Sequence, residues 1–109
     1  MKLVFAIVHD EDAPNVIEAL NNEKLSATRL FSSGGFLKAG NTTMMIGVED
    51  EMLEKALDLI KANSRKHKEN VRSTAHGSFL GGLTTGETIE ITIGGATIFV
   101  TEVERMEKY

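Results

Sequence analysis

Residues 32–43 of this 109-residue chain, SSGGFLKAGNTT, place glycines, an aromatic side chain and an asparagine close together between two apolar segments. Phe36 offers a flat face on which a nucleobase can stack, a contact that contributes roughly 1–3 kcal/mol per base. Asn41 carries a donor and an acceptor and can read the edge of a heterocycle, as asparagine does with adenine. The glycines let a ligand approach the backbone closely. The stretch predicts either a site for a base with phosphates or a hairpin loop that packs on a neighbouring subunit, and residue types alone favour the two about equally.

Motifs for catalysis or metal binding are weak in this chain. It has no cysteine, and its three histidines are not spaced from one another or from carboxylates as metal ligands usually are. Acids before a helix most often act as caps, so the segment HDED at residues 9–12 is interpreted as a cap rather than a cation site. GGFLKAG is neither a Walker motif nor GxGxxG, and no serine lies in a nucleophile elbow. We therefore expect no catalytic residue, no metal and no cofactor.

The charge distribution favours a small anionic ligand over nucleic acid. A net charge of −4 argues against a general nucleic-acid binder, which gains affinity by neutralising many phosphates. Residues 24–48 nevertheless contain no Asp or Glu but include Lys24, Arg29 and Lys38, so the glycine-rich stretch lies in a locally basic segment. The longest apolar run, residues 3–8, is far shorter than the roughly 20 residues of a membrane-spanning helix. We expect a cytoplasmic protein with no membrane contact.

The first half of the chain predicts a strand, a helix and a hairpin. Residues 2–8 are apolar throughout after the first lysine, which is typical of a strand that is central in its sheet and covered on both faces. Asp12 can cap a helix that ends near the paired asparagines, with proline in its first turn and apolar residues at helical spacing. Residues 26–33 and 42–48 have strand composition. The intervening loop, 34–42, is too short for a crossover, so these strands must be antiparallel.

The second half predicts a helix, a long loop and a second hairpin. Asp50 can cap a helix that runs to about Lys66, with basic residues against its negative end. Residues 67–86 show no hydrophobic period and predict a long loop. Residues 88–93 alternate isoleucine with polar residues, and a turn at Gly94-Gly95 then leads into another apolar strand.

This order of elements indicates an α+β protein with the ferredoxin-like β-α-β-β-α-β arrangement and an added C-terminal hairpin strand. Both helices of that arrangement lie on one face of the sheet. The other face is then left uncovered by its own chain, although burying its apolar side chains would stabilise the protein by roughly 25 cal/mol per Å². We therefore expect self-association, most simply into a closed ring, with the number of subunits left open by these considerations.

The segment ATRLFSSGGFLKAGNTTMMIGVED, together with the later GGATIFV, resembles the PII-like cyclic-di-AMP receptor proteins. The similarity covers nearly the full chain and is carried mainly by the G-G-F-L-x-x-G-N-T-T core, whereas residues 67–86 match poorly. It implies a single PII-like domain over residues 1–109 and a PII-like homotrimer. It also implies that one cyclic di-AMP binds in each cleft between subunits, with no catalysis.

The resemblance further implies which residues contact the ligand. The family has a base-contacting loop, an adenine-reading asparagine, a backbone contact, a threonine that faces phosphate or ribose, and an aromatic residue in the cleft. By this resemblance, the base-contacting loop corresponds to Gly35, Phe36 and Leu37, and the adenine-reading asparagine to Asn41. The backbone contact corresponds to Gly47, the threonine to Thr28 and the cleft aromatic to Phe99. Family members can carry a phosphate-facing arginine two residues before the threonine, where this chain has Ser26. Arg29 would point away from Thr28 on a strand, whereas Lys24 shares its side, so Lys24 and Ser26 are the candidate phosphate contacts.

These features predict a signalling protein that senses cyclic di-AMP between subunits. Ligand-dependent ordering of loops 34–42 and 67–86 would then change a surface offered to an unknown downstream protein. One alternative is a PII-like trimer that senses another adenine nucleotide, which Ser26 and the divergent long loop suggest. Another is a small metal-tolerance-like trimer or enzyme, against which the histidine spacing and the lack of cysteine count.

Overall fold

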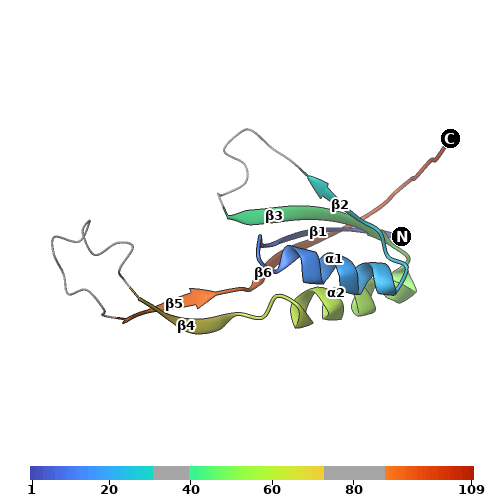
Figure 1. The fold of residues 1–109 in the computed structure, drawn as a ribbon. Helices are drawn as coiled ribbons and strands as arrows, with labels where there is room; N and C mark the ends of the chain where they lie inside the picture. Colours follow the sequence, from blue (N-terminus) through green and yellow to red (C-terminus); the bar gives the residue numbers. More distant parts are fainter. Residues whose placement is uncertain (31–39, 73–87) are drawn as a thin grey trace.

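The computed structural model describes residues 1–30, 40–72 and 88–109, which form a four-stranded sheet with two helices and a separate two-stranded ribbon (Figure 1). In chain order the elements are β1 (Lys2–His9), α1 (Ala13–Asn22), β2 (Ala27–Leu30), β3 (Asn41–Val48), the 3-10 helix η1 (Asp50–Met52), α2 (Leu53–Ala62), β4 (His67–Arg72), β5 (Thr88–Ile93) and β6 (Ala96–Glu102). The protein is α+β, with an antiparallel sheet and two helices that are compatible with the ferredoxin-like fold.

The four strands of the main sheet lie in the order β2-β3-β1-β6, and each neighbouring pair is antiparallel. The apolar strand β1 occupies a central position between β3 and β6, as its sequence predicts. Strands β2 and β3 pair antiparallel, with Ala27 opposite Ile46, which confirms the predicted hairpin partners. Strands β2 and β6 form the two edges of the sheet.

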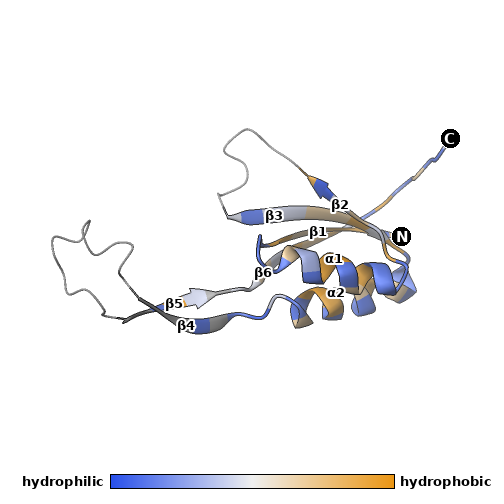
Figure 2. Cartoon of the chain, in the orientation of Figure 1, coloured by the Kyte–Doolittle hydropathy of each residue, from blue (hydrophilic) through white to orange (hydrophobic). Residues whose placement is uncertain are grey.

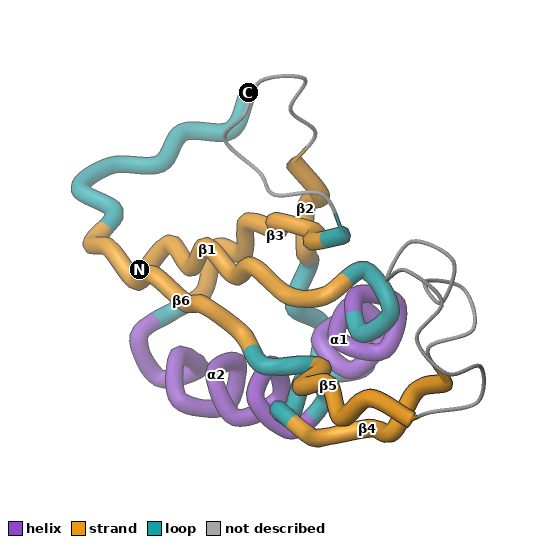
Figure 3. Tube along the Cα trace, turned by 90° about the vertical axis from the view of Figure 1, so that its left-hand side faces the viewer, coloured by secondary structure: helices purple, strands orange, loops and turns teal. Residues whose placement is uncertain are grey.

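The hydrophobic core lies between one face of this sheet and the two helices, which cover the same side (Figures 1 and 3). Alternate residues of β1 and β3 point into it, and each is at most 1% exposed: Val4, Ala6, Val8, Met44, Ile46 and Val48. Val16 and Leu20 of α1 and Ile60 of α2 close the core from the helix side. Both helices show apolar and polar patches in Figure 2, as expected of helices that bury a single face.

The opposite side of the sheet, here called the open face, is covered by neither helix. Leu3, Phe5 and Ile7 of β1 lie on it and are only half-buried. Phe99 of β6 lies on it and is 58% exposed. The described part of the chain therefore leaves an apolar sheet face without a cover, as the order of elements predicts.

The ribbon is formed by β4 and β5, which pair with each other antiparallel, with His67 opposite Ile93. The prediction of a loop over residues 67–86 is therefore wrong for 67–72. The predicted hairpin between the last two strands is also wrong, because β6 pairs with β1 in the main sheet. The sequence of β4, HKENVR, lacks apolar alternation, and among the described side chains of the ribbon Lys68 of β4 forms an ion pair with Glu90 of β5 at 3.4 Å.

Gly94 and Gly95 connect the two sheets instead of closing a hairpin. Both have positive φ, +88° and +93°, a region that favours glycine. The amide of Gly95 donates a hydrogen bond to the carbonyl of Ser64, and a Cβ on Gly94 would overlap the carbonyl oxygen of Arg65. The start of β6 is thus held close to the segment that follows α2.

The helix ends differ in detail from the sequence predictions. Helix α2 ends at Ala62 and not near Lys66. The Ser64 hydroxyl donates to the carbonyl of Ile60 and the Asn63 amide to that of Leu59, which satisfies two carbonyls of the last turn. Asp12 occupies the N-cap position of α1 but makes no side-chain capping bond, and a 3-10 turn precedes α2 where a capping Asp50 was expected.

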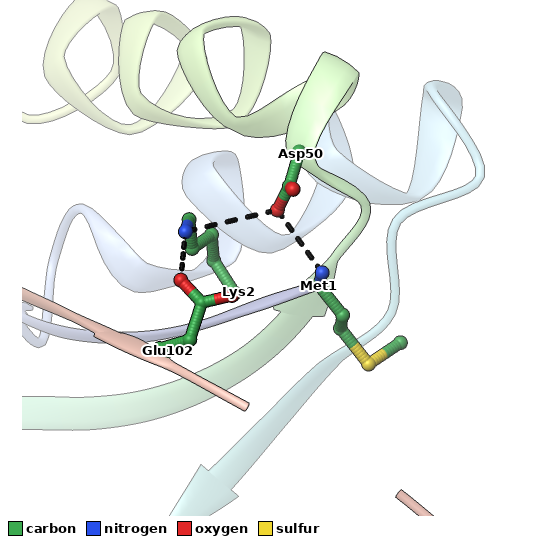
Figure 4. Close-up of polar contacts among 4 residues, drawn as sticks. All are labelled: Met1, Lys2, Asp50 and Glu102. Atoms are coloured by element: carbon green, nitrogen blue, oxygen red, sulfur yellow. Dashed lines mark hydrogen bonds and ion pairs between the residues drawn. The ribbon is translucent and has the colours of Figure 1, made fainter. Parts of the chain in front are cut away.

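Asp50 instead takes part in a charged cluster with the start of β1 and the end of β6 (Figure 4). One of its carboxylate oxygens lies 3.0 Å from the amino group of Met1, while Lys2 contacts Asp50 and Glu102. The contact raises the pKa of the Met1 amino group and lowers the pKa of Asp50. The hydrogen bond to Glu102 raises the pKa of Lys2. Asp50 and Glu102 are solvent-exposed and Met1 and Lys2 only half-buried, so the cluster is screened by salt.

Candidate functional site

Asn41 is the first residue of β3 and pairs with His9 at the end of β1. The prediction that it lies in a loop is therefore wrong. Contacts on both sides fix its position. The carbonyl of Gly40, a residue with φ of +90°, accepts a 2.9 Å hydrogen bond from the amide of Asp10. The Thr42 hydroxyl donates to the Asp10 carboxylate at 2.5 Å. Because side chains alternate along a strand, Asn41 lies on the open face with the other odd-numbered residues of β3.

Thr28 and Phe99 lie in the same row of the open face. Strand register places Thr28 opposite Met45, Met45 opposite Phe5, and Phe5 opposite Phe99. Because Thr28 and Phe99 occupy the two edge strands, three strand spacings of about 4.8 Å separate them, or about 14 Å. A single chain therefore does not bring these two predicted site residues together.

Gly47 lies on the open face near the other end of β3, opposite Leu3. It lies six positions after Asn41, which corresponds to about 20 Å along the strand. Gly47 is exposed, and no atom lies within 4 Å of where a side chain at this position would begin. Open space here would allow a ligand or a second chain to approach the backbone closely.

The two candidate phosphate contacts precede β2 and do not belong to it. Lys24 lies in the turn after α1 with φ of 62°, and its amide donates to the carbonyl of Asn21. The argument that Lys24 shares a strand side with Thr28 is therefore wrong, because the residue is not in an extended segment. Arg29 does point away from Thr28 as predicted, since it pairs with Met44 on the helix-covered side.

The remaining predicted contacts, Gly35, Phe36 and Leu37, lie outside the described residues, as do most of the two predicted loops, 34–42 and 67–86.

Sequence reasoning missed a pocket at the end of the sheet where β1 ends and where β3 and β6 begin. This strand-end pocket has a volume of about 250 Å³. Its polar and glycine lining consists of His9, Asn41, Lys66, Gly94, Gly95 and Thr97. The pairing of β1 with β3 could have placed His9 beside Asn41 from sequence alone. Nothing in the sequence places Lys66 at this pocket, because its charge is equally expected at the end of α2.

In the described part of the chain, no group of three or more His, Asp or Glu side chains is arranged to hold a metal ion. The same residues contain no helix that is long and apolar enough to cross a membrane. What the arrangement offers is recognition chemistry: an amide at Asn41, a cation at Lys66, a hydroxyl at Thr28 and an exposed aromatic ring at Phe99.

Comparisons with known proteins give two findings. A family model described as "Cyclic-di-AMP receptor" matches residues 1–109, the whole chain. A crystal structure of a functionally unknown protein from Pediococcus pentosaceus ATCC 25745 has a similar fold, with a TM-score of 0.75 and 35% sequence identity. That match covers 99% of this chain and 96% of the other.

Proposed function

This chain belongs to the cyclic-di-AMP receptor family, and from that premise we propose that it binds cyclic di-AMP in clefts between copies of itself, as a signalling protein without catalytic activity. The observation that carries the proposal is the family match over all 109 residues. The open face and its polar residues supply the chemistry that a base, a ribose and a phosphate require.

The position of Thr28 and Phe99 supports a site that is shared between chains. They lie on opposite edges of one sheet, about 14 Å apart, which is too far for both to contact one base within a single chain. Edge strands present unpaired backbone groups that can meet a second chain. If the β6 edge of one copy approaches the β2 edge of another, Phe99 of the first lies beside Thr28 of the second.

Association would also cover the open face. Phe5, Met45 and Phe99 form an apolar row that neither helix covers. A closed ring repeats the same contact at every subunit and leaves no open edge, and the homotrimer of PII-like proteins is such a ring. We propose a homotrimer with three equivalent clefts.

Within each cleft, Phe36 and Leu37 hold the face of a base, with Gly35 allowing close approach to the backbone. Asn41 reads the adenine edge through its amide. Ligand-dependent ordering of the parts of the predicted loops that lie outside the described residues, 34–39 and 73–86, would then alter a surface for a downstream protein. Such coupling requires the ligand to bind the ordered loops more tightly than the disordered ones.

Calorimetry with cyclic di-AMP, ATP and cyclic di-GMP tests the proposal. We expect heat of binding with cyclic di-AMP and one site per chain. Because Ser26 replaces a possible phosphate-facing arginine, binding of ATP with no response to cyclic di-AMP would favour a sensor of another adenine nucleotide. A thermal-shift assay gives an independent readout, since ligand at about 100 times its dissociation constant stabilises the native state by roughly 2.7 kcal/mol.

A further inference from the structure

The strand-end pocket is lined by a basic residue and by the proposed adenine-reading residue. Lys66 and Asn41 line it together, and none of its lining residues is acidic. Asp10, which follows the lining residue His9, does not line the pocket, and its carboxylate accepts the hydrogen bond from Thr42. Neither Asp10 nor any other acid of the described residues forms an ion pair with Lys66.

The glycine pair sets the position of Lys66. The hydrogen bond from Gly95 to Ser64 and the close approach of Gly94 to the Arg65 carbonyl hold the segment after α2 against the start of β6. The aliphatic stem of Lys66 then runs over Gly95, with its Cε and Cβ atoms 3.7 and 3.8 Å from the point where a Cβ of residue 95 would lie. These separations are ordinary van der Waals contact, so the Lys66 stem packs against Gly95, whose φ of +93° favours glycine.

We propose that Lys66 contacts a phosphate of the bound cyclic dinucleotide and that the strand-end pocket is the phosphate subsite of the cleft. This inference rests on the proposed function and assigns to Lys66 the phosphate contact that the sequence predicts for Lys24 or Ser26. Within one chain, those two residues precede β2 at the end of the sheet where Gly47 lies, about 20 Å along β3 from Asn41, so they could share a subsite with Asn41 only from different chains. Lys66 lies at the same end as Asn41.

The size and position of the pocket fit this role. Its volume of about 250 Å³ is below the range of roughly 300–1,000 Å³ that pockets for whole drug-sized ligands occupy. It therefore accommodates a phosphate with part of a ribose, and the rest of the ligand must extend beyond it. Thr97 lines the pocket, and Phe99 follows two residues later on the same side of β6, so the pocket continues onto the open face.

A competing explanation for a lysine at position 66 is that its positive charge is attracted to the negative end of α2. Lys61 provides the comparison. It lies in the last turn of α2 and lines a neighbouring cavity that also includes Lys66, but it does not line the strand-end pocket. A general effect of positive charge near this helix end would involve both lysines, whereas a phosphate contact would involve Lys66 alone.

The test is calorimetric titration of cyclic di-AMP into the wild-type protein and the variants Lys66→Met, Lys66→Arg and Lys61→Met, each at low and high salt. Methionine keeps the aliphatic stem over Gly95 and removes the charge. We expect Lys66→Met to bind about tenfold more weakly or worse, since a hydrogen bond to a charged group contributes on that order. Its affinity should also depend less on salt, because one fewer charge is screened. Lys66→Arg and Lys61→Met should bind like the wild type.

Each outcome has a defined meaning. Unchanged affinity in Lys66→Met, or equal losses in Lys66→Met and Lys61→Met, would overturn the assignment while leaving the proposed function intact. Equal losses in Lys66→Met and Lys66→Arg would show that the shape of the stem matters and not its charge, which also overturns it. No binding by the wild-type protein would remove the proposed function itself. Thermal unfolding of each variant without ligand checks that its fold is unchanged.

Discussion

The two faces of the main sheet are built from the same strands, but the two helices cover only one of them. On the helix-covered face, residues such as Val4, Met44 and Ile46 are fully buried by side chains of their own chain. On the open face, the neighbouring residues Phe5 and Met45 are only partly covered, and Phe99 is 58% exposed. The first face carries the hydrophobic core, and the second is the surface on which we propose association and ligand binding.

The position of polar residues follows the same division. Apart from Thr43, which lies on the open side of β3, the sheet residues that are fully buried are apolar. The candidate binding groups Thr28, Asn41 and Phe99 all lie on the open side. Substitutions on the two faces should therefore have separable effects, with stability changing on one face and recognition on the other.

Replacement of a core residue on the helix-covered face should have the largest effect. Ile46 is fully buried, and Ile46→Ala should lower the free energy of unfolding by about 2–5 kcal/mol, because it removes apolar contacts and leaves a cavity. Urea unfolding followed by circular dichroism measures this. The matched control is Met45→Ala, the adjacent residue on the open face. A smaller loss in the Ile46 variant than in the Met45 variant at low protein concentration would contradict the division between faces.

Removal of the exposed ring on β6 should affect ligand binding next most strongly. Phe99→Ala should weaken cyclic di-AMP binding by about 1–3 kcal/mol, the range found for a base stacked on an aromatic side chain. Val100→Ala serves as control, because Val100 pairs with Val4 and faces the helix side. Calorimetry should show a loss for Phe99 and none for Val100, with light scattering to follow the oligomer. Equal affinities in the two variants would place the site away from the β6 edge.

Loss of the adenine-reading amide should have a moderate effect with a specific signature. Asn41→Ala should weaken cyclic di-AMP binding by about 0.5–1.5 kcal/mol, the net contribution of a typical hydrogen bond. It should also reduce the preference for cyclic di-AMP over cyclic di-GMP, because the amide contacts the base edge. Parallel titrations with both ligands measure this. An unchanged ratio of the two affinities would mean that Asn41 does not read the base.

Disruption of the charged cluster at the start of β1 should have the smallest effect, and one that depends on pH. The pKa of Asp50 is lowered from 3.8 and that of the Met1 amino group raised from 8.0. Their contribution to stability is therefore present between these values, is lost as pH falls through the lowered pKa of Asp50, and is lost as pH rises through the raised pKa of the amine. Asp50→Asn should be less stable than wild type near pH 6 and equal to it in strong acid. A constant difference across that range would contradict the assignment.

Hydrophobic period was sufficient to predict the main sheet but not the ribbon. The continuous apolar run of β1 indicated a central strand, and the order of elements indicated that one face would be uncovered. Strand β4 has no such pattern, and its described partner is β5 in the ribbon and not a strand of the main sheet. Gly94-Gly95 was compatible with either a hairpin or a link between sheets, and only the long-range pairing of β4 with β5 decides between them.

The candidate site was predictable to a similar degree. Strand alternation correctly separated Thr28 from Arg29, and the register of β1 with β3 explains why His9 lies beside Asn41. The same alternation failed for Lys24, which is in a turn with positive φ. Lys66 could not be connected with Asn41 from sequence, since the contact depends on how the segment after α2 packs against Gly95.

Subunit complementation tests the central claim that the binding site is shared between chains. Thr28→Glu places a negative charge at the β2 edge, and Phe99→Ala removes the ring from the β6 edge, so each variant alone should bind cyclic di-AMP poorly. In the mixed oligomer, intact Thr28 of one chain meets intact Phe99 of the other. After the two variants are unfolded and refolded together, calorimetry should detect a fraction of sites with wild-type affinity. Recovery of no such sites in oligomers that contain both variants would contradict a shared cleft.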